Sequence, residues 1–200
     1  MKKILVHLLS LEEIQSHEET LLSYVDRERR EKTLKYKRRL NQLQSLGSGY
    51  FLRKYTSMDK KMKYTEYGKP YKDGEFFNIA HSADYVVFLQ TDADCGIDLE
   101  KIRPIKDRLF DYVLSVEDRK EFVTDEDFLQ AWTRKEAIVK TLGGSIFSDI
   151  RKIPSHEGKV FLDDRELFVK TVRYQDYVIS VSVCSKEEIS LEISAEKISV

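Results

Sequence analysis

The sequence is poor in several features that define whole classes of protein. Its 200 residues include only two cysteines, Cys95 and Cys184, which lie far apart. This number excludes a disulfide scaffold, and neither cysteine has the close spacing of a zinc site. No stretch approaches the roughly 18 apolar residues of a membrane-spanning helix. The apolar run at residues 4–9 is too short for a signal peptide, and acidic residues follow it at once. We therefore expect a soluble, cytoplasmic protein.

The sequence also has no excess of positive or negative residues. The chain carries 34 Lys and Arg against 35 Asp and Glu, which gives a formal net charge of -1. This balance argues against a protein that coats nucleic acid, because such binding depends on many basic side chains. The charge is nevertheless uneven along the chain. Residues 26–39 hold eight basic and three acidic side chains, whereas residues 73–100 hold seven acidic side chains and no Lys or Arg. A basic run is usually a solvated helical face, but it can also bind phosphates.

Hydrophobic residues make up 41% of the chain, which is enough for a core in a protein of this size. Apolar alternation predicts strands at 3–9, 76–79, 85–90, 95–99, 165–174, 177–184 and 189–194, and the last three have the pattern of antiparallel strands. Capping residues and helical periodicity predict helices at 10–24, from 26, at 37–55, 106–114, 116–123 and 125–142. This order predicts an α+β fold of two similar halves, residues 1–102 and 103–200, joined near Arg103-Pro104.

Two carboxylates stand out near the end of the acidic block. Asp98 and Glu100 are two apart on a predicted strand and therefore point to the same face. A hard divalent cation would relieve the repulsion between them, although a polar strand end at the surface would give the same pattern. Glu136 and Lys140 are four apart on a predicted helix and can form an ordinary ion pair. Glu136 gains interest as a third carboxylate for a metal held by Asp98 and Glu100.

Two further residues could bind phosphate. His81 follows an apolar strand, where we expect a loop to begin, and an imidazole there can donate to a phosphate oxygen. Lys69 lies beside Pro70 in a rigid turn and could supply a point charge for a phosphate. A histidine or a turn lysine by itself is more often a structural or surface residue. Each signal is therefore weak alone.

Taken together and in order, the motifs carry more information. They are EYGKP at 66–70, FNIAHS at 77–82, GIDLE at 96–100 and WTRKEAIVK at 132–140. This set resembles the pattern of the larger, pseudo-dimeric 4′-phosphopantetheinyl transferases, over about residues 28–145. The resemblance implies two similar halves related by a pseudo-twofold axis, with the active site at their interface. It also implies a Mg²⁺-dependent enzyme that moves the phosphopantetheine arm of coenzyme A onto a serine of an apo acyl or peptidyl carrier protein and releases 3′,5′-ADP.

The resemblance assigns roles to particular residues of this chain. Asp98, Glu100 and Glu136 would coordinate Mg²⁺, or Mn²⁺, together with the pyrophosphate of coenzyme A. Glu136 would also act as general base for the carrier serine. Lys140 would bind the phosphate under attack, and His81 would donate to a phosphate.

The same resemblance implies the binding site for the rest of coenzyme A. Lys69 would hold phosphate, and Pro70 would lie in a turn beside the adenine. Arg29 and Lys32 match basic positions that reach the 3′-phosphate. Coenzyme A and one carrier protein would be the partners, without nucleic acid or membrane, and a monomer would suffice.

Three positions depart from the family pattern. Ala80 replaces a serine before the histidine, and Gln44 replaces an arginine that also serves the 3′-phosphate in many relatives. Losing these donors should weaken that site, so we hypothesise weaker discrimination between coenzyme A and its 3′-dephospho form. Ser145 replaces the second glycine of a G-x-G turn, which restricts the loop after the helix at 125–142.

Two other interpretations remain open at this level. A degenerate homologue could bind coenzyme A or a carrier protein without transfer, but the metal and lysine positions are retained. A nucleic-acid-binding module could use the basic run, but the net charge and the acidic block oppose it. For carrier docking, the sequence offers residues 101–108 and 110–112, which could equally be ordinary helix surface. Which carrier protein is served cannot be read from the sequence.

Overall fold

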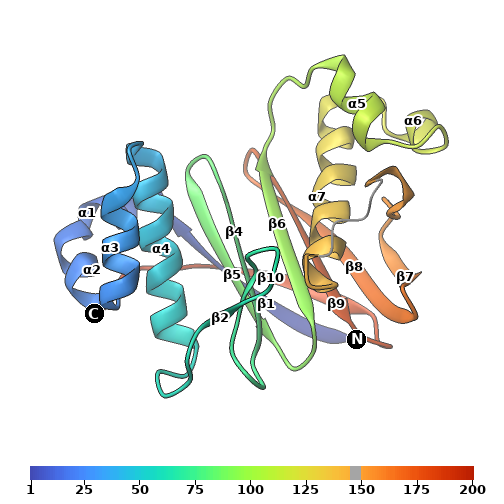
Figure 1. Ribbon diagram of the computed structural model, residues 1–200. Helices are drawn as coiled ribbons and strands as arrows, with labels where there is room; N and C mark the ends of the chain where they lie inside the picture. The colour runs from blue at the N-terminus through green and yellow to red at the C-terminus, as the bar shows by residue number, and fades with distance from the viewer. Residues whose placement is uncertain (145–149) are drawn as a thin grey trace.

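The computed structural model describes residues 1–144 and 150–200 and has a mixed α+β architecture (Figure 1). One four-stranded sheet has the order β10-β1-β5-β4, a second has the order β6-β9-β8-β7, and β2 and β3 form a small hairpin. The strands are β1 (Lys2–Ser10), β2 (Lys63–Tyr64), β3 (Pro70–Tyr71), β4 (Phe76–Ser82), β5 (Tyr85–Thr91), β6 (Cys95–Lys101), β7 (Gly158–Leu162), β8 (Arg165–Tyr174), β9 (Tyr177–Cys184) and β10 (Ile189–Ala195). The helices are α1 (Leu11–Ser16), α2 (Glu18–Tyr24), α3 (Arg27–Lys35), α4 (Arg39–Tyr55), α5 (Asp107–Val113), α6 (Asp118–Glu121) and α7 (Asp125–Thr141), with a 3₁₀ turn at Ile150–Lys152.

The two sheets carry their helices at opposite sides of the molecule. Helices α1 to α4 lie beside the first sheet, and α7 packs across the second sheet with α5 and α6 at one end (Figure 1). The long helix α4 buries a continuous stretch from Leu43 to Leu52, and its Phe51 stacks on Phe88 of β5. Apolar residues of β1, β5, β6 and β9 form one further core between the sheets. Burial of these apolar strand residues between the two sheets holds the sheets together.

Capping residues begin several helices, and the caps at Ser10 and Asp26 are those that the sequence predicts. The Asp26 side chain accepts from the Arg29 amide at 2.7 Å at the start of α3, and Thr124 with Asp127 forms a capping box before α7. Ser10 accepts from the Glu13 amide, but the predicted helix at 10–24 is interrupted at His17 and becomes α1 and α2. The predicted helix at 116–123 is also shorter, because only Asp118–Glu121 is helical.

The last strand pairs differently from the prediction. Strands β8 and β9 are antiparallel, as expected, but β10 runs parallel to β1 in the first sheet. Alternation determines which side chains of a strand face a core, and it leaves the partner strand undetermined. Just after β10, the Glu196 carboxylate accepts from Lys54 at 2.7 Å and from Tyr55 at 2.8 Å, which fixes this segment to α4.

Strands β4 and β6 lie side by side although they belong to different sheets (Figure 1). The buried Asn78 of β4 bridges them, because its side-chain oxygen accepts from the Ile97 amide of β6 at 2.9 Å. This hydrogen bond fixes β6 beside the neighbouring sheet, one residue before Asp98. Among the residues that the model describes, no helix is long and apolar enough to cross a membrane.

Candidate active site

The strand β6 presents two carboxylates at the junction of the sheets. Asp98 is buried, and its Oδ1 accepts from the Lys140 ammonium at 2.6 Å. Its other oxygen, Oδ2, is buried without a hydrogen-bond partner among the described residues. Glu100 is less buried, and its Oε2 accepts from the Ser82 hydroxyl of β4 at 2.9 Å. The site therefore contains a carboxylate oxygen that no protein group satisfies.

Helix α7 supplies the groups that face this strand. Lys140 donates to the Ile97 carbonyl at 3.2 Å as well as to Asp98, so it lies directly against β6. Glu136 is one helical turn before Lys140. The helix approaches this closely because Gly96 has no side chain: a Cβ there would lie 2.1 Å from the Ala137 carbonyl oxygen. Gly96 thus decides how near α7 can lie to the β6 carboxylates.

The three carboxylates influence one another electrostatically. Burial raises the pKa of Asp98, although the Lys140 ammonium counteracts this. The pKa of Glu100 is raised by burial and by Asp98. The pKa of Glu136 is raised by burial and then by the charges of Asp98 and Glu100. The structure therefore brings all three sequence-predicted carboxylates into one electrostatic group.

This group fits a divalent cation chemically, although no metal cluster is already assembled. Within residues 1–144 and 150–200, no three His, Cys, Asp or Glu side chains are arranged as a ready metal site. Lys140 instead supplies the positive charge at Asp98. An unsatisfied carboxylate oxygen and three carboxyl groups with raised pKa values are what a hard, oxygen-seeking cation would relieve. The residues present fit such an ion.

His81 lies near the same group, but not in a loop. The expected loop start is wrong, because β4 continues through Ser82 and pairs His81 with Val86 of β5. The turn begins at Ala83, whose φ of 44° is adopted without the glycine that usually marks such a turn. Two effects lower the pKa of His81. The larger is the loss of solvation of the imidazole among protein atoms, and the second is the positive charge of Lys140. The lowered pKa favours the neutral imidazole beside the carboxylates, although the residue as a whole is exposed.

Lys69 is placed differently from a free phosphate ligand. Its ammonium donates to the backbone carbonyls of Cys95 at 3.0 Å and Lys140 at 2.5 Å. Burial lowers the pKa of Lys69. Pro70 is the first residue of β3 and is half-buried. The turn predicted around these two residues is present, with Gly68 at a φ of 80°.

The residues expected at the 3′-phosphate lie on α3 and α4. Lys32 is exposed and lines a hollow of about 410 Å³ on α3. The Arg29 side chain is half-buried and runs close to Gly49 of α4. Gln44 is buried, and its Nε2 donates to the Ala83 carbonyl at 3.3 Å, so it reaches the turn after β4. Among the described residues, neither Arg29 nor Lys32 has a hydrogen bond or ion pair to the carboxylate group. Ser145, the third departure from the family pattern, lies outside the described residues.

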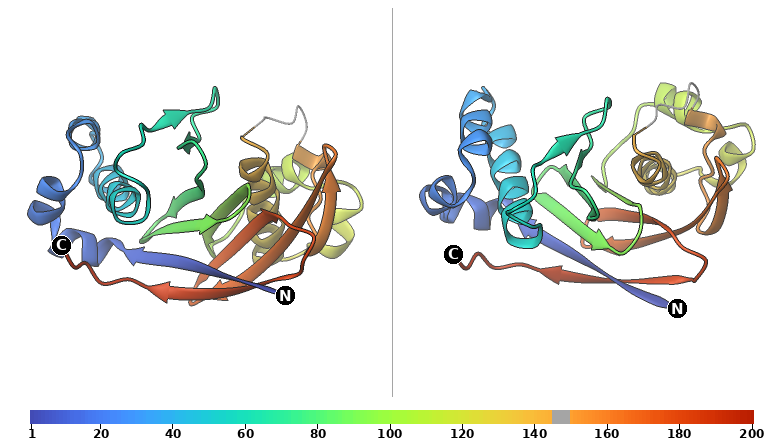
Figure 2. Two further views of the ribbon diagram at one scale, coloured as in Figure 1. Left: turned by 90° about the horizontal axis from the view of Figure 1, so that it is seen from below. Right: turned by 60° about the horizontal axis from the view of Figure 1, so that its bottom comes forward.

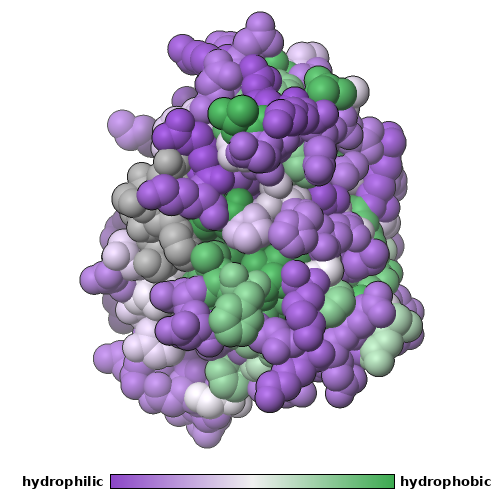
Figure 3. Space-filling model, turned by 90° about the vertical axis from the view of Figure 1, so that its right-hand side faces the viewer, coloured by the Kyte–Doolittle hydropathy of each residue, from purple (hydrophilic) through white to green (hydrophobic). Residues whose placement is uncertain are grey.

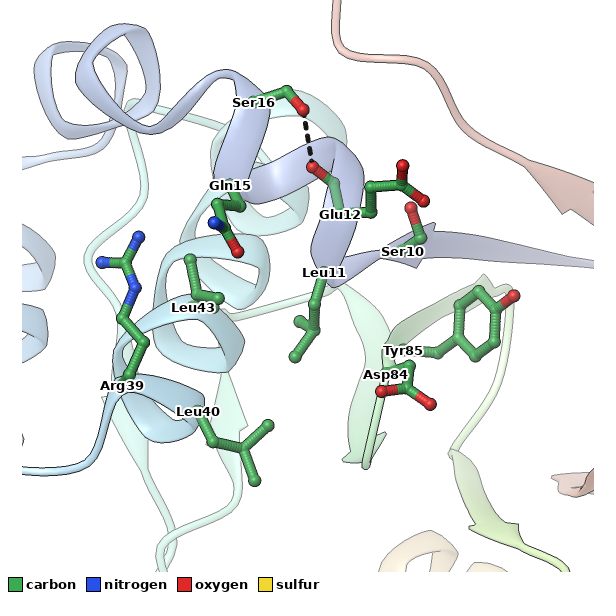
Figure 4. Close-up of a pocket in the computed structure, with 10 residues that line it drawn as sticks. All are labelled: Ser10, Leu11, Glu12, Gln15, Ser16, Arg39, Leu40, Leu43, Asp84 and Tyr85. Carbon is green, nitrogen blue, oxygen red and sulfur yellow. Dashed lines mark hydrogen bonds between the residues drawn. The ribbon is translucent and has the colours of Figure 1, made fainter.

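The structure also contains two hollows that the sequence did not predict. Figure 4 shows one of about 760 Å³ between α1, the start of α4 and the start of β5, with Leu11 and Leu43 on its floor and Arg39 and Asp84 at its rim. A smaller hollow of about 110 Å³ adjoins the β6 carboxylates. It is lined by Glu100, Arg103, Ile105, Leu109, Val113, Phe128, Leu129 and Trp132.

Sequence reasoning also missed two residues of β4. Asn78 bonds the Ile97 amide, and Ser82 bonds the Glu100 carboxylate. Both lie in the FNIAHS segment, so their place in a recognised motif was the available signal. Their partners could not be read from spacing, because β4 and β6 are brought together only by tertiary packing.

Comparison with known proteins shows similarity to one family. Residues 94–182, which include β6 and α7, match the model of the 4'-phosphopantetheinyl transferase superfamily. The chain is 38% identical over 97 residues to 4'-phosphopantetheinyl transferase AcpT of Salmonella typhi, covering 42% of this chain and 50% of that protein. It is 32% identical over 142 residues to AcpT of Escherichia coli strain K12, covering 65% and 63%. It is 28% identical over 195 residues to 4'-phosphopantetheinyl transferase ffp of Bacillus subtilis, covering 85% and 87%.

These similarities all concern one family. The segment at residues 94–182 is similar to the 4'-phosphopantetheinyl transferase superfamily, and the named relatives extend this similarity over more of the chain. The matched segment spans about half of the length of the Salmonella relative, at 50%, and of the Bacillus pumilus relative psf-1, at 55%.

Proposed function

We propose that this protein transfers the 4′-phosphopantetheine arm of coenzyme A to a serine of an apo acyl or peptidyl carrier protein. The observation that carries the proposal is the convergence of Asp98, Glu100, Glu136 and Lys140 between β6 and α7. The similarity of residues 94–182 to the 4'-phosphopantetheinyl transferase superfamily supports the same activity, with coenzyme A and a carrier protein as the two substrates.

In the proposed reaction, the serine oxygen attacks the phosphorus that bears pantetheine. The bond from this phosphorus to the bridging oxygen breaks, and 3′,5′-ADP leaves with the electron pair. The serine proton passes to the Glu136 carboxylate, whose raised pKa makes it a stronger proton acceptor than an ordinary glutamate. Lys140 faces the same space and would stabilise negative charge on the phosphate under attack. His81, held neutral by its surroundings, would donate one hydrogen bond to a phosphate oxygen.

Asp98, Glu100 and Glu136 would hold the divalent cation. A bound Mg²⁺, or Mn²⁺, would neutralise pyrophosphate charge and make the phosphorus more electrophilic. The unsatisfied Oδ2 of Asp98 supports its place in this set. Lys140 already occupies Asp98 Oδ1 in the structure. When the cation binds, the Lys140 ammonium must share the Asp98 carboxylate with the cation or move from Oδ1 toward the phosphate.

We propose that the fold has pseudo-twofold symmetry, with residues 1–102 and 103–200 as its two halves. Support comes from the two four-stranded sheets and from one long helix, α4 or α7, of 17 residues beside each. Each sheet takes one strand from the other half, because β10 lies in the first sheet and β6 in the second. The carboxylates lie where β6 meets the neighbouring sheet, which is consistent with an active site between the halves.

We propose that the carrier protein docks over the connector and α5. Tyr112 is 68% exposed on α5, and Val116 and Val123 are exposed nearby. Figure 3 shows small, separate apolar areas among hydrophilic side chains near the top of the side that carries these helices, and a larger apolar area lower on the same side. Lys106 and Arg108 add positive charge, which suits an acidic partner.

The test of the function is the intact mass of an apo carrier protein after incubation with this protein, coenzyme A and Mg²⁺. A gain of one phosphopantetheine mass is expected, and it should disappear with a chelator or in Glu136→Ala. Glu126→Ala is the matched control, because Glu126 lies on the same helix but forms an exposed ion pair with Arg173. No gain with several unrelated carriers, while coenzyme A still binds, would favour a homologue that binds without transfer.

The departures from the family pattern lead to a more specific proposal. The Gln44 side-chain amide donates its hydrogen bond to the Ala83 carbonyl, and Ala80 has no hydroxyl group. Recognition of the 3′-phosphate should therefore be weak. The KM values for coenzyme A and its 3′-dephospho form should therefore be similar. A large preference for coenzyme A would contradict this reasoning.

A further inference from the structure

Lys69 joins the two elements that carry the candidate catalytic groups. Its ammonium donates to the carbonyl of Cys95, the first residue of β6, and to the carbonyl of Lys140, in the last turn of α7. Strand β6 carries two of the carboxylates, and α7 carries the third. A single side chain from the β2–β3 hairpin thus contacts both elements of the site.

The segment that presents Lys69 is closed by its own hydrogen bonds. The Thr65 amide donates to the Lys69 carbonyl at 2.9 Å, and the Lys69 amide donates to the Thr65 hydroxyl at 3.1 Å. The Gly68 amide donates to the Thr65 carbonyl at 2.9 Å. The loop also lies against the end of α7, because a Cβ on Gly144 would be 3.3 Å from Tyr67. Figure 2 shows this hairpin in the space between the helices of the first sheet and α7.

The chemistry of a helix end explains why an ammonium belongs there. The last carbonyls of a helix lack intrahelical partners and form the negative end of its dipole. The Lys140 carbonyl accepts a long hydrogen bond from the Gly143 amide at 3.3 Å, and Lys69 adds a shorter one at 2.5 Å. Lys69 makes its second hydrogen bond to the Cys95 carbonyl of β6. Two of its three N–H groups are therefore committed to backbone carbonyls.

We propose that Lys69 is a positioning residue, which fixes the end of α7 against the start of β6 and so sets the distance between Glu136, Lys140 and the β6 carboxylates. This inference rests on the proposed transferase function. It gives Lys69 a role distinct from the phosphate contact that the family resemblance implies.

Kinetics of Lys69→Met separate the two roles. Loss of positioning should lower kcat by about 10- to 100-fold, while KM for coenzyme A changes by less than about threefold. Lys69→Arg should recover part of kcat, because it keeps donors at this end of the helix. Lys63→Met is the matched control: Lys63 lies on the same hairpin but pairs with Asp73 at 2.6 Å, away from α7. It removes the same charge and should leave both constants unchanged.

Amide hydrogen exchange without substrate gives a second readout. Lys69→Met, but not Lys63→Met, should speed exchange at Leu142 and Gly144, whose amides bond the last turn of α7. A rise in KM for coenzyme A with kcat unchanged would overturn the proposal in favour of direct phosphate binding. Unchanged kinetics and exchange would also overturn it. If the wild type transfers nothing to any carrier, the proposed function fails, and the exchange rates alone decide whether Lys69 holds the helix.

Discussion

Replacing Gly96 with alanine should separate the catalytic helix from the strand that carries the carboxylates. The new Cβ would lie 2.1 Å from the Ala137 carbonyl oxygen, 2.6 Å from the Thr141 amide nitrogen and 2.9 Å from the Lys140 Cβ. The first two are backbone atoms of α7, which no side-chain rotation can move. The Ala137 oxygen must therefore retreat by about 0.9 Å to reach even a 3.0 Å contact.

The size of this shift determines the expected effect. Glu136 and Lys140 flank Ala137 on α7, so both move with the backbone. A displacement near 1 Å at a catalytic group lowers the rate by about 100-fold. Overpacking of a tight interface lowers the free energy of unfolding by about 1–3 kcal/mol. Gly96→Ala should therefore lower kcat for phosphopantetheine transfer much more than it lowers the population of folded protein.

The assay compares kcat and denaturant unfolding of Gly96→Ala with Gly47→Ala. Gly47 lies on α4, where a Cβ would meet the Ile14 Cδ1 atom at 2.5 Å. This obstacle is the end of a flexible side chain, so it can rotate away. Gly47→Ala should keep kcat and change stability by less than about 1 kcal/mol. Wild-type kcat and stability in Gly96→Ala would refute the idea that close approach of α7 positions the site.

Two further predictions concern stability. Asn78→Ala should lower the free energy of unfolding by about 1–3 kcal/mol, because the buried Ile97 amide loses its acceptor, and urea unfolding that matches the wild type would contradict this. Burial alone would raise the pKa of Asp118, but hydrogen bonds from Ser155 and Lys135 outweigh it and hold the pKa below its usual value. The stabilising contribution of Asp118 is therefore complete above its unfolded-state pKa, near ~3.9, and is lost as the pH falls through the lower folded-state pKa. Unfolding measured from pH 7 to pH 2 should show a smaller loss of stability for Asp118→Asn than for the wild type, and equal losses would exclude this role.

Local signals predicted much of the fold because they act over a few residues. The cap at Asp26, the helical periodicity from residue 125 and the alternation at 165–174 and 177–184 depend only on neighbouring positions, and each element formed where expected. The partner of β10 could not be predicted in this way, since pairing with β1 depends on the packing of the whole chain. The break at His17 was also missed, because no proline or glycine marks it.

In the candidate site, too, the residues could be predicted from sequence motifs, whereas the contacts that depend on tertiary packing could not. Motif order indicated Asp98, Glu100, Glu136 and Lys140, and the structure brings them together. The contacts of Lys69 and the close approach at Gly96 involve backbone atoms of a distant helix, which no sequence pattern specifies. The roles of these residues in binding and catalysis stay predictions for the experiments above.

The parallel pairing of β1 with β10 has a consequence for how the molecule forms. During synthesis, β1 is made before the other strands, and its neighbour β10 exists only after more than 180 further residues have been added. Until then one side of β1 offers unpaired backbone groups to any other strand nearby. Contacts so distant in sequence also slow folding, since a long loop must close before they form. The first sheet should therefore be the last part of the protein to reach its native order, and nascent chains should be most prone to aggregation before β10 is made.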